Sequence, residues 1–182
     1  TVTHTPGINA MSVAEHALGL LLSARRHTVA GHETVEAGGW RDDVPRGSLL
    51  TGTTVGIVGF GNIGRRVASL LRGFDVDLLA YDPYVDSIDG EPVHAELVAL
   101  DSLLERSDSV MVDADLTDET RGMIGDDAFA RMRDDAVLVN VGRGPVVDTD
   151  ALVSALEQDE LGFAALDVTD PEPLPADHPL YD

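Results

Sequence analysis

A glycine motif at the end of an apolar run limits the fold of this chain more than any other feature. Residues 59–64 read GFGNIG, which has the form G-x-G-x-x-G, and they directly follow the run TTVGIV at 53–58. Apolar residues then keep helical spacing over 62–74. A strand, a glycine turn and a helix in this order are typical of the phosphate-binding turn of a dinucleotide-binding fold.

The three glycines of this motif predict three physical roles. Gly59 permits a tight turn after the strand, Gly61 lets a pyrophosphate approach the backbone, and Gly64 allows the helix to pack closely on the strand. The phosphates would then face N–H groups at the N-terminus of the helix. The motif alone is weak because glycine is common, but its place between strand and helix predicts a bound dinucleotide.

The rest of the chain repeats the same alternation of strand and helix. Short apolar or β-branched runs lie at 53–58, 76–80, 108–112, 136–141 and 163–166. Helical patterns lie between them, at 62–74, 96–106, 125–133 and 148–159. This order predicts right-handed βαβ units, and hence an α/β fold with a doubly wound parallel sheet of the Rossmann type in three layers, αβα. Only five strands are evident, so we expect the sixth strand to be lost by truncation.

The segment before the sheet has a different pattern. Ser12 and Glu15 have the spacing of a capping box, and the apolar residues behind them predict a helix over 12–28. A polar stretch with several glycines at 37–52 contains the only tryptophan, Trp40, and predicts a loop. We therefore expect residues 1–52 to form a helix and a loop that lead into a dinucleotide-binding domain at 53–182.

An acidic residue follows the second predicted strand. Asp82 comes 18 residues after Gly64 (82 − 64), where such folds place a carboxylate that accepts hydrogen bonds from the adenosine ribose. A carboxylate there would repel the 2′-phosphate of NADP, and no arginine lies beside it in the sequence. Asp82 therefore favours NAD as the cofactor, although one of the 23 aspartates could fall here by chance.

An arginine between two glycines follows the fourth predicted strand. Arg143 lies in the run NVGRGP at 140–145. Ligands of doubly wound sheets bind beyond the carboxyl ends of the strands, at the point where the strand order reverses. A guanidinium there could hold a carboxylate-bearing substrate through two parallel hydrogen bonds. From its position alone, a surface arginine that offsets local acid is an equal alternative.

Five blocks of sequence together resemble one enzyme family. They read TPGINAMSVAEH (5–16), TVGIVGFGNIGRRVA (54–68), YDP (81–83), VLVNVGRGPVVD (137–148) and ALDVTDPEPLPADHPLY (165–181). In this order they closely resemble the D-isomer-specific 2-hydroxyacid dehydrogenases, which include phosphoglycerate dehydrogenases and glyoxylate/hydroxypyruvate reductases. The resemblance implies an NAD-dependent oxidoreductase with a substrate domain and a cofactor domain joined by crossover helices. This chain resembles the cofactor domain, with residues 1–52 as a crossover helix and loop and with the substrate domain absent.

The resemblance also implies roles for single residues. Arg143 matches the family's catalytic arginine, which binds the carboxylate and carbonyl of a 2-oxo acid, and Glu172 matches the glutamate that pairs with the catalytic histidine. Asn62 and Ile63 match the pyrophosphate-binding turn. Positions that line the nicotinamide end are matched by Val141, Gly142 and Asp167. No metal site is implied.

Two departures from the family pattern stand out. The catalytic histidine is expected beyond the chain end at Asp182, and His178 belongs to a block that precedes it. Where the family usually has His-x-Pro after the third strand, this chain has Asp113 and Asp115. Two carboxylates near an anionic cofactor would weaken its binding unless they point away or are screened.

These patterns predict the NAD-binding domain of an enzyme that transfers a hydride between nicotinamide and a D-2-hydroxy acid or 2-oxo acid. The chain alone is expected to be inactive. A non-catalytic NAD(H)-sensing module is an alternative, because co-repressor relatives keep the same motifs. Formate dehydrogenase is disfavoured because it has glutamine where Glu172 stands, and a methyltransferase-like domain because the motif RGP at 143–145 has no role there.

The charge of the chain limits its partners. The 12 basic residues, all arginine, stand against 33 acidic ones, which gives a formal net charge of −21. Such a surface repels nucleic acid and anionic membranes, and no apolar run approaches the roughly 20 residues of a membrane span.

The absence of cysteine excludes disulfides and thiolate chemistry. We expect a cytoplasmic protein with a small-molecule substrate, and the resemblance implies a homodimer through the region that matches about residues 10–50.

The acid excess runs along the whole chain and lysine is absent, which predicts adaptation to high salt. At 1 M salt the screening length falls to about 3 Å, and the self-repulsion of a strongly negative protein weakens. We expect the Tm, followed by circular dichroism, to rise as KCl is raised from about 0.1 M to about 2 M. A flat or falling Tm would instead indicate an ordinary acidic protein.

Overall fold

The sheet has the strand order of a doubly wound fold. The computed structural model describes residues 7–88 and 94–181, and its sheet runs in the order β3-β2-β1-β4-β5-β6 with every neighbouring pair parallel. The strands are β1 (Thr54–Val58), β2 (Asp77–Tyr81), β3 (Glu96–Leu97), β4 (Ser109–Val112), β5 (Val137–Asn140) and β6 (Phe163–Leu166). The strand order reverses between β1 and β4. The predicted α/β fold is therefore confirmed.

The expectation of a lost sixth strand is wrong. Six strands are present in the described residues, and the strand missed by sequence reasoning is β3. It pairs with β2 through two residues only, Leu79 with Glu96 and Ala80 with Leu97. Because Glu96 is exposed and only Leu97 is partly buried, the strand is too short to show a period-2 pattern. The helix predicted over 96–106 accordingly begins later, at Leu100.

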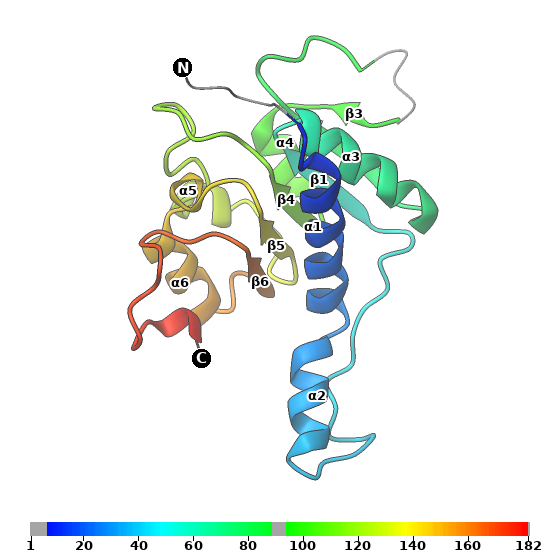
Figure 1. Ribbon diagram of the computed structural model, residues 1–182, viewed down its shortest axis with the longest axis vertical. Coiled ribbons are helices and arrows are strands. Elements are labelled where there is room, and N and C mark those ends of the chain that lie inside the picture. Colours follow the sequence, from blue (N-terminus) through cyan, green and yellow to red (C-terminus); the bar gives the residue numbers. More distant parts are fainter. Residues whose placement is uncertain (1–6, 89–93, 182) are drawn as a thin grey trace.

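Helices cover both faces of the sheet, as the three-layer prediction requires (Figure 1). One face packs against α1 (Ala10–Arg25) and α3 (Asn62–Leu71). The other face packs against α4 (Leu100–Arg106), α5 (Asp126–Phe129) and α6 (Thr149–Glu157). The described residues also contain three short 3-10 helices: η1 (Arg72–Phe74), η2 (Gly144–Val146) and η3 (Pro179–Tyr181).

The first predicted helix, over 12–28, is in fact two helices. The chain takes the left-handed conformation at His27 (φ 48°), which separates α1 from α2 (Thr28–Glu36). The capping box at Ser12 is wrong, because α1 begins at Ala10 with Asn9 at the N-cap position. The buried stripe of α1 starts at Ala10, so packing against the sheet, rather than the capping signal, sets where the helix begins.

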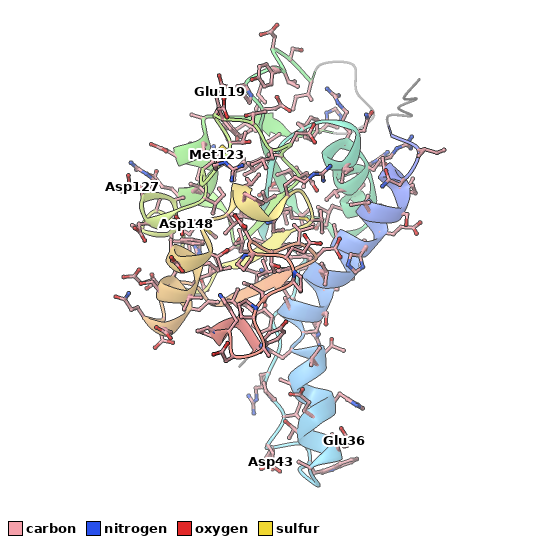
Figure 2. All side chains as sticks on the ribbon, turned by 60° about the vertical axis from the view of Figure 1, so that its left-hand side comes forward. Glu36, Asp43, Glu119, Met123, Asp127 and Asp148 are labelled. Carbon is pink, nitrogen blue, oxygen red and sulfur yellow. The ribbon has the colours of Figure 1, made fainter. Side chains whose placement is uncertain are left out.

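The segment formed by α2 and the following loop extends away from the sheet, and we call residues 28–50 the arm (Figure 1). Helix α2 has no buried residue. Figure 2 shows Glu36 and Asp43 at its tip, at the opposite end of the molecule from Glu119. The loop runs back along the helix, since a Cβ on Gly31 would lie 3.4 Å from the side chain of Val44. The arm thus exposes most of its surface.

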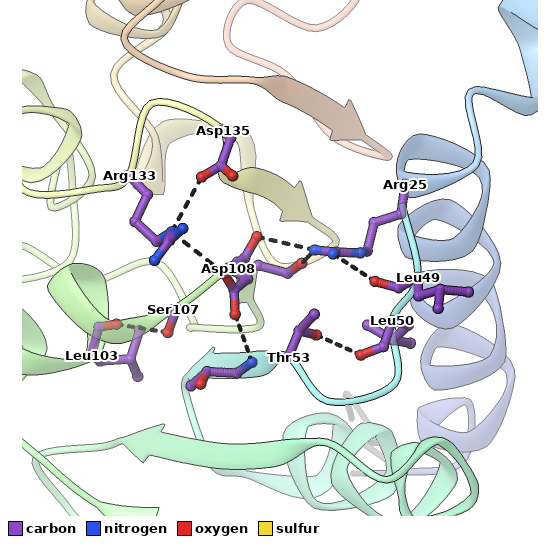
Figure 3. A network of polar contacts seen from close by, with 11 residues as sticks. Arg25, Leu49, Leu50, Thr53, Leu103, Ser107, Asp108, Arg133 and Asp135 are labelled. Carbon is purple, nitrogen blue, oxygen red and sulfur yellow. Dashed lines mark hydrogen bonds and ion pairs between the residues drawn. The ribbon is translucent and has the colours of Figure 1, made fainter. Parts of the chain in front are cut away.

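A buried arginine ties α1 to the amino-terminal edge of the sheet (Figure 3). Arg25, only 7% exposed, donates hydrogen bonds to the hydroxyl of Ser109 (2.9 Å) and to the carbonyl oxygens of Asp108 (3.3 Å) and Leu49 (2.7 Å). Burial lowers the pKa of this guanidinium, while the charges of Asp108 and Asp135 act against that shift. Removing such a buried cation would leave several polar groups unpaired.

Asp108 extends this network across the same edge. One carboxylate oxygen accepts a hydrogen bond from the N–H of Thr54 at 2.8 Å, which joins the starts of β1 and β4. The other lies 3.4 Å from the guanidinium of Arg133, which also pairs with Asp135 at 3.2 Å (Figure 3).

No helix among the described residues is long and apolar enough to cross a membrane.

Candidate functional site

The turns after β1 and β5 pack against the end of β4 without room for side chains. Gly59 has φ 96°, and a Cβ on it would lie 2.8 Å from the backbone nitrogen of Ala114. A Cβ on Gly142 would lie 2.8 Å from the carbonyl oxygen of Ala114. Three strand ends therefore converge where the strand order reverses, which is where doubly wound folds bind ligands.

The glycine turn leads directly into α3. A Cβ on Gly64 would overlap the carbonyl oxygen of Gly59 and lie 3.0 Å from Ile57, so the helix packs tightly against the turn and the strand. By contrast, Gly61 is exposed, and a Cβ on it would meet no atom within 4 Å. Gly61 is also the N-cap of α3 and has no side chain to bind the N–H groups of the first turn. This helix terminus has the space and the donors to hold a phosphate.

The two residues that follow, Asn62 and Ile63, begin α3. Ile63 is partly buried and packs into the core shared by α1 and α3. The side chain of Asn62 is exposed and lies close to the start of α1, where a Cβ on Gly7 would be 3.4 Å from its amide carbon. Residues 5–6, at the start of the first matched block, lie outside the described residues.

Asp82 follows β2 and is held by backbone donors. One carboxylate oxygen accepts a hydrogen bond from the N–H of Phe60 in the glycine turn, and the other accepts one from the N–H of Tyr84, both at 2.9 Å. Each carboxylate oxygen has capacity for a further hydrogen bond. The carboxylate therefore lies beside the glycine turn, in reach of a ligand that sits on that turn.

A contact between Tyr84 and Glu119 connects the segments after β2 and β4, and sequence reasoning missed it. The Tyr84 hydroxyl donates to a Glu119 carboxylate oxygen at 3.0 Å. This hydrogen bond, together with the charge of Glu119, raises the pKa of Tyr84. The two residues are 35 positions apart, so no local pattern could have paired them.

The loop after β5 holds Arg143 near the turn at Gly142. Buried Asn140 fixes this loop, because its side chain accepts from the N–H of Gly142 (3.1 Å) and donates to the carbonyl of Arg143 (3.2 Å). The Arg143 guanidinium is exposed and donates to the carbonyl of Gly142 at 2.7 Å. Val141 is buried. Arg143 thus has a fixed backbone and a side chain with donors to spare.

The segment that contains Glu172 lies against the Arg143 loop. A Cβ on Gly144 would overlap the carbonyl oxygen of Thr169, so these two stretches of backbone are in close contact. The Thr149 hydroxyl donates to the carbonyl of Asp170 at 2.7 Å and holds the segment in place. Glu172 itself is exposed. No ion pair joins Glu172 to Arg143 in the part of the chain that the structure describes.

Asp167, directly after β6, forms an ion pair that the sequence did not indicate. Its carboxylate lies 3.1 Å from Nε2 of His16 on α1, and both side chains are about half exposed, at 45% and 53%. The N–H of Asp167 donates to the carbonyl of Asn140 at 2.9 Å, which continues the ladder between β5 and β6. His16 therefore faces the same edge of the sheet as Gly142.

The two aspartates that depart from the family pattern have opposite surroundings. Asp115 is exposed. Both carboxylate oxygens of Asp113 are buried and have no hydrogen-bond partner among the described residues, although the residue as a whole is partly exposed. Burial raises the pKa of Asp113 to about 7. Only one of the two is therefore a candidate for a role in ligand binding.

Together these features fit a bound dinucleotide. The glycine turn leaves space at Gly61 for a pyrophosphate, Asp82 lies beside that turn, and the strand ends leave the carboxyl group of Asp113 unpaired. A metal site is a different matter: within residues 7–88 and 94–181, no three His, Asp or Glu side chains group as ligands.

Comparison with known families agrees with this geometry. Residues 18–182 match the family model described as D-isomer specific 2-hydroxyacid dehydrogenase, NAD binding domain. The chain belongs to this family. Its cofactor is accordingly NAD, and its fold is that of the family's cofactor domain.

Similar proteins include whole dehydrogenases and a solved complex with NAD. A glyoxylate reductase of Thermofilum pendens is 43% identical over 98% of this chain and 54% of its own length. A D-3-phosphoglycerate dehydrogenase of Archaeoglobus fulgidus is 38% identical over 98% of this chain and 34% of its own length. The structure of an NAD-dependent formate dehydrogenase from Staphylococcus aureus in complex with NAD matches with a TM-score of 0.89 and 38% identity, over 97% of this chain and 53% of that one. The chain thus spans about half or less of these relatives.

Gly64 and Gly61 provide a matched pair of variants. Gly64→Ala places a Cβ against the Gly59 backbone, so we expect the free energy of unfolding, measured in urea, to fall by about 2 kcal/mol. Gly61→Ala meets no atom, so its stability should change by less than about 0.5 kcal/mol. NADH affinity, measured by fluorescence, should nevertheless fall about tenfold or more in Gly61→Ala, because the methyl group would lie where the pyrophosphate approaches. Unchanged affinity in that variant would contradict this placement of the phosphates.

Proposed function

We propose that this chain is the part of a D-2-hydroxyacid dehydrogenase that binds NAD and supplies two catalytic side chains. The main support is the close contact between Gly144 and Thr169. This contact brings the loop of Arg143 against the segment of Glu172, next to the turn at Gly142. Groups for substrate binding and for proton transfer would then adjoin the cofactor turn at one edge of the sheet.

In this proposal the cofactor lies across the carboxyl edge. The N–H groups at the start of α3, with Gly61, Asn62 and Ile63, hold the pyrophosphate, and Gly59 and Gly64 shape the turn. Asp82 accepts hydrogen bonds from the adenosine ribose and repels a 2′-phosphate, which favours NAD over NADP. The nicotinamide end is bordered by Val141, Gly142, Arg143 and Asp167. When bound, NAD(H) supplies the hydride acceptor or donor at the nicotinamide ring.

The substrate is held by Arg143. Its guanidinium can bind the carboxylate of a 2-oxo acid through two hydrogen bonds and polarise the adjacent carbonyl. Glu172 orients a histidine that donates a proton to the substrate oxygen during reduction and removes it during oxidation. The resemblance places this histidine outside the printed sequence. Residues 1–52 then connect this domain, 53–182, to a substrate domain.

The substrate class follows from the relatives. Names such as glyoxylate reductase, D-3-phosphoglycerate dehydrogenase and hydroxypyruvate reductase support a phosphoglycerate, glycerate/hydroxypyruvate or glyoxylate substrate. The likeness to a formate dehydrogenase is close, but Glu172 is a carboxylate where those enzymes carry glutamine. A non-catalytic NAD(H) sensor is the second candidate, because it would share every feature of the cofactor site.

The arm supports a homodimer. Helix α2 buries no residue of its own chain, and a helix of nine residues has little stability in water without packing. The arm exposes Val29 (60%) on this helix and Trp40 (74%) and Leu49 (69%) in the loop that follows it. A second copy of this chain is the occupant we propose for this apolar surface. The net charge of −21 on each copy makes high salt favourable for the contact, in a salt-adapted, cytoplasmic parent protein.

An assay of the parent protein tests the proposed function. The 182-residue chain should bind NADH and prefer it to NADPH, but reduce no 2-oxo acid. The parent protein should reduce glyoxylate or hydroxypyruvate, or oxidise phosphoglycerate, and Arg143→Gln should lower kcat/KM about a hundredfold or more with NADH affinity little changed. Turnover of these acids by the isolated chain would refute the mechanism. A parent protein that binds NADH but acts on no member of the panel would support the sensor.

The dimer is tested by a charge in the arm. Trp40→Asp should convert the chain from dimer to monomer, because it places a carboxylate in an apolar contact. Light scattering after gel filtration in about 2 M KCl measures the mass. Tyr181→Asp is the matched control, an exposed aromatic residue outside the arm (63% exposed), and should leave the dimer intact. A wild-type chain that is monomeric in high salt would rule out this surface as a self-contact.

A further inference from the structure

The position of Asp113 is defined by its backbone. It is the first residue after β4, and its N–H donates to the carbonyl of Val58 at the end of β1 at 2.8 Å. Its carbonyl carbon lies 2.9 Å and 3.2 Å from where Cβ atoms on Gly59 and Gly142 would be. Asp113 is therefore enclosed by the turns after β1 and β5, at the reversal of the strand order.

The side chain leaves the sheet toward α1 and α3. Successive side chains of a strand point to opposite faces. Val112 and Ala114 belong to the core under α4, α5 and α6, whereas Met111 belongs to the core with α1 and α3. Asp113 alternates with Val112 and Ala114, so it lies on the face of Met111. This is also the face on which the glycine turn opens into α3.

No group in the described part of the chain forms a hydrogen bond with the carboxyl group of Asp113. Both oxygens are buried without a hydrogen-bond partner among the described residues, and burial alone raises the pKa of Asp113. The charged or titratable side chains toward this end of the elements around it are Arg65 and Arg66 on α3, Glu15 and His16 on α1, Tyr81 at the end of β2, Asp82, Arg143 and Asp167 after β2, β5 and β6, and Asp115 on its own segment, whereas Arg25 of α1 belongs to the network at the amino-terminal edge. Within the described ranges, no ion pair or hydrogen bond joins any of these side chains to the carboxyl group of Asp113. A carboxylate in such a place is unfavourable, and the neutral acid has a proton to donate.

We propose that Asp113 binds the cofactor as a neutral carboxylic acid, which donates a hydrogen bond to an acceptor oxygen of the dinucleotide and couples NAD(H) binding to the uptake of one proton. This rests on the cofactor site proposed above. The ionised carboxylate has no proton to donate and would lie against an anionic ligand, so the ionised form opposes binding. The acid satisfies itself and the ligand with a single hydrogen bond.

The sign of the pH dependence follows. Below the pKa of Asp113 in the empty site, the acid is already protonated and affinity is independent of pH. Above that pKa, a proton must be taken up on binding, and affinity falls about tenfold for each pH unit. A carboxylate that accepted hydrogen bonds from ribose hydroxyls would produce the opposite slope. The dinucleotide itself does not titrate in this range.

The experiment is a titration of the 182-residue chain with NADH, followed by fluorescence between about pH 6 and about pH 9 at constant high KCl. The wild-type affinity should fall toward a tenfold loss per pH unit at the alkaline end. Asp113→Asn keeps the shape and a donor but cannot ionise, so its affinity should be flat over the same range. Asp115→Asn, an exposed neighbour on the same segment, should retain the wild-type slope.

Calorimetry of the wild type gives a test that needs no variant. Binding of NADH at about pH 8, in two buffers of different ionisation enthalpy, should show uptake of close to one proton. No proton uptake, an affinity that rises with pH, or an equal slope in Asp113→Asn would overturn the role of Asp113 and leave the NAD site standing. A wild-type chain that binds no NADH at any pH would overturn the proposed function together with it.

Discussion

The close backbone packing around Ala114 is the constraint on which the candidate site depends. The turns after β1 and β5 both press on this residue, and neither Gly59 nor Gly142 leaves room for a side chain there. Because these turns begin at fixed points on a parallel sheet, the start of α3 and the loop of Arg143 are fixed with them. The site is therefore a consequence of how three strand ends meet, rather than of contacts between its functional side chains.

The two edges of the sheet divide the polar interactions between stability and binding. At the amino-terminal edge, the terminal nitrogens of Arg25 and the carboxylate of Asp108 are paired, and they join α1 to the starts of β1 and β4, although Nε of Arg25 is buried without a partner among the described residues. At the carboxyl-terminal edge, polar groups keep unused donors and acceptors: the N–H groups of α3, the Arg143 guanidinium and the carboxyl group of Asp113. Helix α1 contacts both edges of the sheet. Arg25 in its last turn lies at the amino-terminal edge, and His16 in its middle pairs with Asp167 at the carboxyl-terminal edge.

The sequence predicted the long, apolar parts of the fold and missed the short or tertiary ones. Five strands and the turn at Gly59 were evident because parallel strands covered on both faces are nearly continuous apolar runs, which holds even for β6, where no residue is fully buried. The two-residue strand β3 has no periodicity, and α2 has no buried face, so neither left a pattern. In the candidate site, the glycines and Asp82 could be proposed from their spacing along the chain. The pairs Tyr84–Glu119 and His16–Asp167 join distant segments, so they required the structure.

The net charge of −21 opposes the binding of anions at the carboxyl-terminal edge of the sheet. An anionic dinucleotide, and in our proposal an anionic substrate as well, must bind a protein whose long-range field repels anions. The groups that we propose to bind these anions act over a few ångströms: the helix N–H groups at Gly61, the guanidinium of Arg143, and the carboxyl group of Asp113, whose pKa burial raises to about 7. High salt removes the long-range repulsion and leaves these short-range contacts in force, because screening weakens interactions with distance. Acid on the surface and anion binding at one edge are therefore compatible when the buried carboxyl group of Asp113 is neutral.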